Sequence, residues 1–180
     1  MNHFVLAITG PTGAGKSTVG EKVAKSLPSC VNIDADHIKH MVVSGFYVNE
    51  TSPEDPEGWG FSEWDLVGDS IGLLARNFLD HNYDVVINGY INEPAWHAIE
   101  KHIDIYCKIL LLPDVDKVKL RDSGRVADIQ MGEETVTKHH KHFSNDKFYK
   151  DFITLDTTEH SVEETVEAVL STLGIHNVNK

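Results

Sequence analysis

Hydrophobic residues along the chain fall into two patterns, short apolar runs and longer segments with an apolar residue at every third or fourth position. Five short runs are bounded by glycine, proline or polar residues, and they lie at residues 4–9, 30–33, 83–88, 103–112 and 152–155. Apolar runs of this length are typical of strands that are buried on both faces of a parallel sheet. We therefore expect a five-stranded sheet with a covered interior.

The segments between these runs have helical spacing. We expect helices at residues 17–27, 37–43, 62–78, 95–102, 115–121, 133–143 and 161–173. Three of these helices have candidate N-caps, namely Asp36, Ser62 and Ser161, the last with Glu164 three positions on in a capping box. Alternating strands and helices predict an α/β fold with a doubly wound parallel sheet and helices on both faces.

Length and composition favour one soluble domain over residues 1–180. The chain is 41% hydrophobic and 24% charged, and it has no apolar run of the roughly 20 residues that span a bilayer. We expect no signal peptide, since the first apolar run is needed as a strand, and we expect Cys30 and Cys107, which stand apart in apolar runs, to be buried free thiols. We expect a cytoplasmic protein without a membrane partner, either a monomer or a homodimer.

The net charge of −12 argues against a nucleic-acid partner, because binding to a phosphate backbone needs a clustered basic surface and the sequence has none.

The first apolar run leads directly into a glycine-rich loop with the spacing Gly-x-x-x-x-Gly-Lys-Ser. Between a buried strand and a helix, such a loop cradles phosphates with its backbone N–H groups, its lysine reaches the β- and γ-phosphates, and its serine hydroxyl binds Mg²⁺. The motif predicts that ATP and Mg²⁺ are the cofactors. The expected nucleotide-binding residues of this loop are Gly10, Pro11, Thr12, Gly13, Ala14, Gly15, Lys16, Ser17 and Thr18.

Two carboxylates, Asp34 and Asp36, follow the second apolar run. At the exit of a strand they can divide the work, one facing the metal and the other a substrate hydroxyl. The third run ends in Asn88, at the place where many proteins with this loop have a metal-orienting aspartate. Asn88 therefore weakens the case for a water-activating ATPase.

Two further segments are candidates for closing over a ligand. Residues 44–64 form a long loop in which aromatic residues are interspersed with acids, and Arg121 and Arg125 flank Gly124 in a segment that extends to about residue 133. Mobile guanidinium groups can neutralise the charge of a transferring phosphoryl group. The alternative for Arg121 is a solvated helix end, paired with Asp122 or Asp116.

The histidine-rich run 138–142 invites a metal hypothesis, but its interleaved lysines repel a cation, and we expect a solvated helix face there.

These motifs resemble those of the small P-loop kinases of the gluconate, shikimate, adenylylsulfate and chloramphenicol kinase type, within the nucleoside-monophosphate-kinase-like fold. The resemblance covers nearly the whole chain. It implies a three-layer P-loop NTPase fold with strand order 2-3-1-4-5. It also implies that Asp36 is the catalytic base or acceptor anchor and that Asp34 helps Ser17 to hold Mg²⁺. The flap would be residues 44–64 and the lid residues 121–133.

The resemblance also implies that Lys16 and the lid residues Arg121 and Arg125 act in catalysis. The loop after the last strand, around Thr157 and Thr158, would border the adenine, and Arg121 and Thr157 are expected among the nucleotide-binding residues.

The acceptor region is more acidic than this family would lead one to expect. From Asp34 to Glu100 the sequence has two basic residues, Lys39 and Arg76, against thirteen aspartates and glutamates. Sites for anionic acceptors normally supply arginine forks. We therefore predict a kinase that phosphorylates a hydroxyl of a neutral or cationic small molecule. The alternatives are a gluconate or nucleotide kinase with an anionic acceptor, and a non-catalytic ATP-binding switch.

Overall fold

The structure, a computed structural model, describes residues 3–44, 63–127 and 130–175. Five strands form one parallel sheet with the order β2-β3-β1-β4-β5. The strands are β1 (Val5–Thr9), β2 (Cys30–Asp34), β3 (Asp84–Asn88), β4 (Cys107–Leu111) and β5 (Ile153–Leu155). Both the five predicted strands and the predicted order are confirmed.

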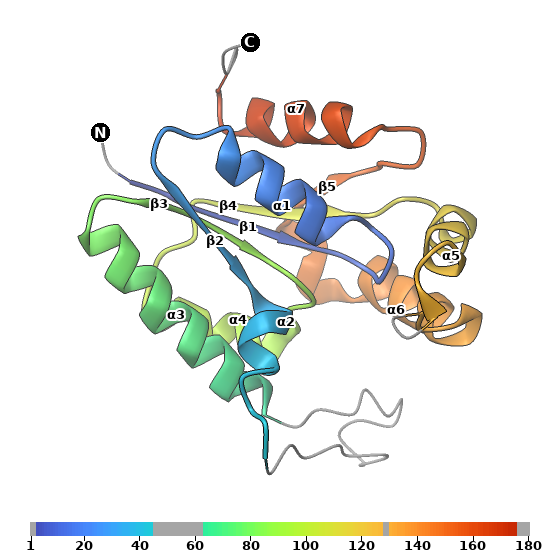
Figure 1. The fold of residues 1–180 in the computed structure, drawn as a ribbon, viewed down its shortest axis with the longest axis horizontal. Helices are drawn as coiled ribbons and strands as arrows, with labels where there is room; N and C mark the ends of the chain where they lie inside the picture. Colours follow the sequence, from blue (N-terminus) through green and yellow to red (C-terminus); the bar gives the residue numbers. More distant parts are fainter. Residues whose placement is uncertain (1–2, 45–62, 128–129, 176–180) are drawn as a thin grey trace.

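Helices cover both faces of this sheet (Figure 1). On one face lie α1 (Lys16–Lys25) and α7 (Val162–Thr172), and on the other lie α3 (Trp64–Asp80), α4 (Glu93–Glu100) and α6 (Glu133–Asn145). The remaining helices are α2 (Ala35–Lys39), α5 (Val115–Ser123) and a short 3-10 helix (Lys147–Asp151). Successive side chains of β1 serve the two faces, since Val5 and Ala7 belong to one buried cluster and Leu6 and Ile8 to the other.

The capping predictions had different outcomes. Helix α7 begins with the expected capping box of Ser161 and Glu164. The prediction that Asp36 caps α2 was wrong, because the cap is Asp34, whose carboxylate accepts the N–H of Asp36 at 2.9 Å. The strand passes into the helix without a loop, so the carboxylate two residues earlier reaches a free N–H group of the first turn. Ser62, the cap predicted for α3, lies outside the described residues.

Both cysteines are free thiols, as expected, but only Cys107 is buried, whereas Cys30 is half-buried. Among the helices that the structure describes, none combines the length and apolar composition that a bilayer crossing requires.

Candidate functional site

The loop between β1 and α1 has a backbone that only glycine adopts readily. Gly10, Gly13 and Gly15 have φ angles of 149°, 85° and 90°. A Cβ on Gly10 would lie 2.3 Å from the carbonyl oxygen of Leu111, and one on Gly13 would lie 2.8 Å from that of Val118. The loop is thus packed tightly against the end of β4 and against α5.

Lys16 stands at the start of α1 and donates from Nζ to the carbonyl oxygen of Pro11 at 2.9 Å. Burial lowers the pKa of Lys16 to about 8, Asp36 and Asp34 oppose this, and the positive charge of Arg125 adds to it. A cation in such surroundings gains more than a solvated one from an anionic ligand.

A cavity of about 530 Å³ opens beside this lysine, which is large enough for a small ligand. Its walls come from the phosphate loop and α1, from α2, from the start of α3, from the segment after β3, and from the lid region with α6. The lining residues are Thr12, Gly15, Lys16, Ser17, Thr18, Asp36, Lys39, His40, Trp64, Tyr90, Arg125, Met131 and His139.

The two aspartates after β2 face different surroundings. Asp36, and not Asp34, is among the described residues that line the cavity. Asp34 caps α2 with one oxygen. Both carboxylates are close enough to Lys16 to raise its pKa. The structure therefore separates a structural carboxylate beside the loop from one that faces the cavity.

Asn88 lies buried at the end of β3, beneath α1. Its amide nitrogen donates to Oδ1 of Asn32 at 2.9 Å, and its Oδ1 has no hydrogen-bond donor within the described part of the chain. A Cβ on Gly20 of α1 would come within 3.0 Å of Asn88, so the glycine allows helix and strand to approach closely. Asn88 therefore puts an uncharged amide at the place where many proteins with this loop have a metal-orienting aspartate.

The two arginines of the lid region point to different parts of the site. Helix α5 ends at Ser123, so Arg121 is helical and Arg125 is not. Arg121 donates to the carbonyl oxygen of Thr157 at 3.1 Å, whereas Arg125 lines the cavity and lies 3.5 Å from a carboxylate oxygen of Asp122. Within the described residues Arg121 pairs with neither Asp122 nor Asp116, the two partners of the alternative expectation.

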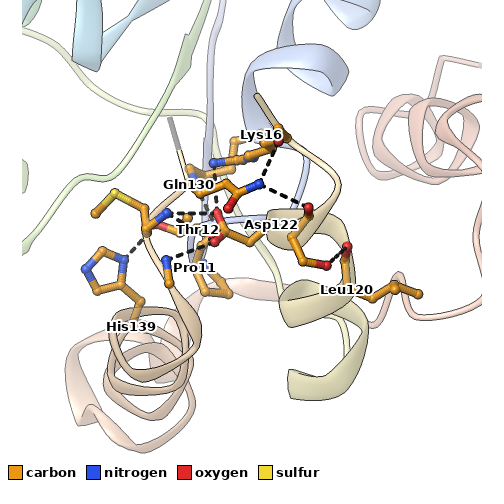
Figure 2. Close-up of polar contacts among 11 residues, drawn as sticks. Pro11, Thr12, Lys16, Leu120, Asp122, Gln130 and His139 are labelled. Carbon is orange, nitrogen blue, oxygen red and sulfur yellow. Dashed lines mark hydrogen bonds and ion pairs between the residues drawn. The ribbon is translucent and has the colours of Figure 1, made fainter. Parts of the chain in front are cut away.

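Asp122 and Gln130 shape the lid region, in roles that the sequence did not indicate. Asp122 is buried and accepts the N–H groups of Met131 and Gly132, each at 3.1 Å. Gln130 donates to the carbonyl oxygens of Ser123 and Arg125, as Figure 2 shows. These contacts join the end of α5 to the start of α6. An acidic residue in a charged helix gave no sequence signal for this role.

The expectation of a solvated face for the run 138–142 was wrong for His139. Its side chain is buried in the cavity wall, and Nδ1 lies 2.8 Å from Oγ1 of Thr12 in the phosphate loop (Figure 2). Its neighbour His140 lies with Nε2 2.9 Å from the carbonyl oxygen of Pro113. Only the fold brings α6 against the loop, so helical spacing could not reveal this contact. Within the described residues no group of three metal-ligating side chains gathers.

Aromatic rings close the side of the cavity away from the phosphate loop. Trp64 and Tyr90 have ring centroids 5.2 Å apart, and Nζ of Lys39 lies 5.2 Å from the centre of the Trp64 ring. Burial lowers the pKa of Lys39, and Asp36 opposes this. The predicted flap falls mostly on residues 45–62, outside the described residues.

The oxygen atoms at the start of α1 and at the ends of β2 and β3 are of the kind that bind Mg²⁺. Ser17 offers a hydroxyl at the cavity, Asp34 and Asp36 offer carboxylates at the end of β2, and Asn88 has a buried amide oxygen without a described donor. Mg²⁺ prefers such oxygen ligands and usually takes few from the protein, because it keeps several waters and binds the nucleotide phosphates.

Comparisons with known proteins agree with this geometry. Residues 5–105, more than half of the chain, match the sequence model of a family described as NTPase. No curated protein sequence matches the chain significantly.

Solved structures resemble the fold over nearly its whole length. The tunicamycin resistance protein of Deinococcus radiodurans is 14% identical, with a TM-score of 0.69 and 97% of each chain covered. A sugar kinase from a Janibacter species is 16% identical, with a TM-score of 0.67 and coverage of 96% of this chain and 95% of the other. A gluconokinase from Sinorhizobium meliloti is 16% identical, with a TM-score of 0.65 and coverage of 96% and 93%. At these identities the likeness concerns the fold.

Proposed function

The chain belongs to the NTPase family whose model it matches, and from this premise we propose that it is an ATP-dependent small-molecule kinase. It would transfer the γ-phosphoryl group of MgATP to a hydroxyl of a neutral or cationic small molecule. The observation that carries the proposal is that one cavity is lined by Lys16, Arg125 and Asp36. These are two cations for a transferring phosphoryl group and one carboxylate for an attacking hydroxyl.

The nucleotide would lie along the phosphate loop. The N–H groups of Gly13 to Thr18 and the N-terminal end of α1 suit its phosphates, and Lys16 would exchange the carbonyl of Pro11 for a phosphate oxygen. The contact of Arg121 with Thr157 supports a position for the base between α5 and the loop after β5. Ser17 and Asp34 would hold Mg²⁺, which would neutralise charge on the phosphates.

Asp36 would orient the acceptor hydroxyl and accept its proton during transfer. It faces the same cavity as Lys16 and Arg125, so a hydroxyl bound to it would stand near the phosphoryl group that the two cations stabilise. Asp34 is engaged in the cap of α2 and suits a fixed role at the metal.

The described cavity wall has three cations, Lys16, Lys39 and Arg125, and one carboxylate, Asp36, and the support for a neutral or cationic acceptor is that these cations form no guanidinium fork. On the acceptor side the described cations are Lys39, whose ammonium lies over the ring of Trp64, and Arg125, which is close to Asp122. Arg76, the other basic residue of the acceptor region, pairs with Asp80 on the exposed side of α3. No described pair of guanidinium groups faces the cavity as a fork for a carboxylate or phosphate.

The alternative is an anionic acceptor, such as gluconate or a nucleotide. The observation that favours it is that Lys39 lines the cavity. A non-catalytic ATP-binding switch would leave Asp36 without an acceptor hydroxyl to orient.

We also propose a cytoplasmic protein that acts as a monomer or homodimer and binds no nucleic acid.

Ligand-induced stabilisation tests the proposal without knowledge of the acceptor. The protein is heated alone, with MgATP, and with a non-hydrolysable ATP analogue plus neutral, cationic or anionic hydroxyl compounds. A ligand that binds the native state raises the melting temperature according to its concentration and Kd. We expect a shift with nucleotide and a further shift with a neutral or cationic compound. A further shift with anionic compounds alone would favour the alternative, and none with any compound would favour the switch.

A further inference from the structure

His139 has no part in the proposed transfer step, yet it occupies a position that connects two regions of the site. It lies in α6 with 8% of its surface exposed, and its Nδ1 is 2.8 Å from Oγ1 of Thr12, a residue 127 positions earlier in the sequence. Both residues line the cavity next to Lys16. A side chain that is buried and hydrogen-bonded to the phosphate loop has a direct mechanical connection to the nucleotide site.

The imidazole of His139 is held firmly by an aromatic cluster. Its ring centroid is 5.4 Å from that of Tyr90, which also packs against Phe143 at 5.5 Å. Phe143 in turn lies 4.7 Å from Tyr149, whose hydroxyl donates to the carbonyl oxygen of Ile91 at 3.1 Å. Helix α6 is thereby fixed to the segment after β3. Thr12 therefore bonds to a partner that is already fixed in place.

His139 remains neutral in this position. Burial lowers the pKa of His139 to about 3, and the positive charges of Lys16, His142 and Lys39 act in the same direction. A neutral imidazole offers one donor and one acceptor, and it adds no charge to compete with Lys16 for phosphate. The ring is suited to hold a hydroxyl group in the wall of an anion site.

Helix α6 also carries the connection to the lid region. It begins at Glu133, immediately after Met131 and Gly132, whose N–H groups bind the buried carboxylate of Asp122. In Figure 2 Asp122 of α5, Gln130 of the segment between α5 and α6, and His139 of α6 lie around Thr12 and Lys16. The end of the lid and the partner of Thr12 thus belong to one helix.

We infer that His139 is a positioning residue, which fixes the Thr12 side of the phosphate loop to α6 and so holds the loop in the shape that binds nucleotide. The inference rests on the proposed function, because it concerns the affinity of the same loop for MgATP. His139 would act through Thr12 and not by touching the phosphates.

Substitutions at both ends of this hydrogen bond test the inference. His139→Phe keeps a ring against Tyr90 but removes the bond, and Thr12→Val removes it from the other side. His139→Asn and Thr12→Ser are the matched controls, since an asparagine amide reaches nearly as far as Nδ1 and serine keeps the hydroxyl. The affinity for a non-hydrolysable MgATP analogue is measured by titration calorimetry, and thermal unfolding of each variant is recorded without ligand.

We expect His139→Phe and Thr12→Val each to weaken binding about tenfold, the range for a buried hydrogen bond whose other partner is left behind. The double variant should bind no more weakly than either single variant, because both changes remove the same bond. His139→Asn should bind like the natural protein, and Thr12→Ser should lose less affinity than Thr12→Val, because serine keeps the hydroxyl that bonds to His139.

Three outcomes would overturn the inference. These are unchanged affinity in His139→Phe despite a lower melting temperature, additive losses in the double variant, and a loss in His139→Asn as large as in His139→Phe. Failure of the proposed function would look different, since the natural protein itself would then not bind the analogue. If His139→Phe does not fold, the comparison of Thr12→Val with Thr12→Ser still decides, because equal affinities of these two variants would contradict the inference.

Discussion

The phosphate side and the acceptor side of the cavity are built in different ways. The phosphate side is one continuous stretch from Gly10 to Thr18, in which the backbone provides most of the binding groups and the glycines set its shape. The acceptor side is assembled from side chains of α2, α3, the segment after β3 and α6. A local motif can therefore specify nucleotide binding, whereas the acceptor depends on elements that meet only in the folded chain.

Removing the ammonium of Lys16 should have the largest effect. In Lys16→Ala we expect MgATP affinity to fall and phosphoryl transfer to slow by about 10²–10³-fold, as when one preorganised charge or donor is lost from a transition-state site. The control is Lys22→Ala on the same helix, where the lysine is exposed and pairs with Glu163. Calorimetry with MgATP and single-turnover rates measure the two effects. Equal MgATP affinities and equal transfer rates of Lys16→Ala and Lys22→Ala would contradict the role proposed for the phosphate side of the cavity.

The next largest effect should come from the carboxylate on the acceptor side. Asp36→Asn should lower the transfer rate by about 10²-fold or more, the usual contribution of a general base, and leave MgATP affinity nearly unchanged. Steady-state kcat and equilibrium Kd are compared in the same preparation.

Asp34→Asn sharpens the same comparison, because asparagine caps a helix as well as aspartate does but carries no charge. This variant should keep its melting temperature and need more Mg²⁺ to reach half-maximal activity. The division of work between the two aspartates would be wrong if Asp34→Asn lost transfer and Asp36→Asn lost the response to Mg²⁺.

The two lid arginines should differ in what they change. Arg125 lines the cavity, so Arg125→Ala should reduce kcat by about tenfold or more with a small change in KM for ATP. Arg121 contacts Thr157 and is not among the described residues that line the cavity, so Arg121→Ala should chiefly raise KM for ATP. Initial rates over a matrix of ATP concentrations separate these effects. If Arg121→Ala lowered kcat without changing KM for ATP, the proposed assignment of the transfer step to Arg125 would be wrong.

The smallest effect is a proton taken up by Lys16 as nucleotide binds. In the free protein the pKa of Lys16 is about 8, and a phosphate anion beside the ammonium would raise it. Binding above pH 8 should therefore consume protons, and affinity should fall as pH rises through that value, because the free lysine must first be charged. Calorimetry at pH 8.5 in buffers of different ionisation enthalpy measures the uptake. Lys16→Arg should abolish it, since arginine stays charged at that pH.

Sequence reasoning was most successful where structure follows from neighbouring residues. The conformations of the apolar runs and of the loop from Gly10 to Ser17 follow from their own residues. Continuous apolar runs suit strands buried on both sheet faces, and glycines permit the backbone angles of the loop. The strand order was predicted by family resemblance and is confirmed.

The sequence was least informative about residues whose partners are distant. Asp122 looks like a surface position in a charged helix, and the helical spacing that puts His139 near the face of Val136 and Phe143 does not identify its partner. In the folded chain Asp122 accepts the N–H groups of Met131 and Gly132, and His139 lies against Thr12. Periodicity identifies the apolar stripe of a helix, but it does not identify a polar side chain that finds a buried partner on another element. The cap of α2 was misjudged for a related reason, because the prediction assumed a loop between β2 and the helix where there is none.

Transfer of phosphate from γ-labelled MgATP to a panel of hydroxyl compounds tests the central claim most directly. The panel contains neutral, cationic and anionic members of similar size, and Asp36→Asn serves as the control for chemistry in this cavity. The account predicts labelled product with a neutral or cationic compound and its loss in the variant. Efficient labelling of anionic compounds alone, or release of labelled phosphate to water without any acceptor product, would contradict it.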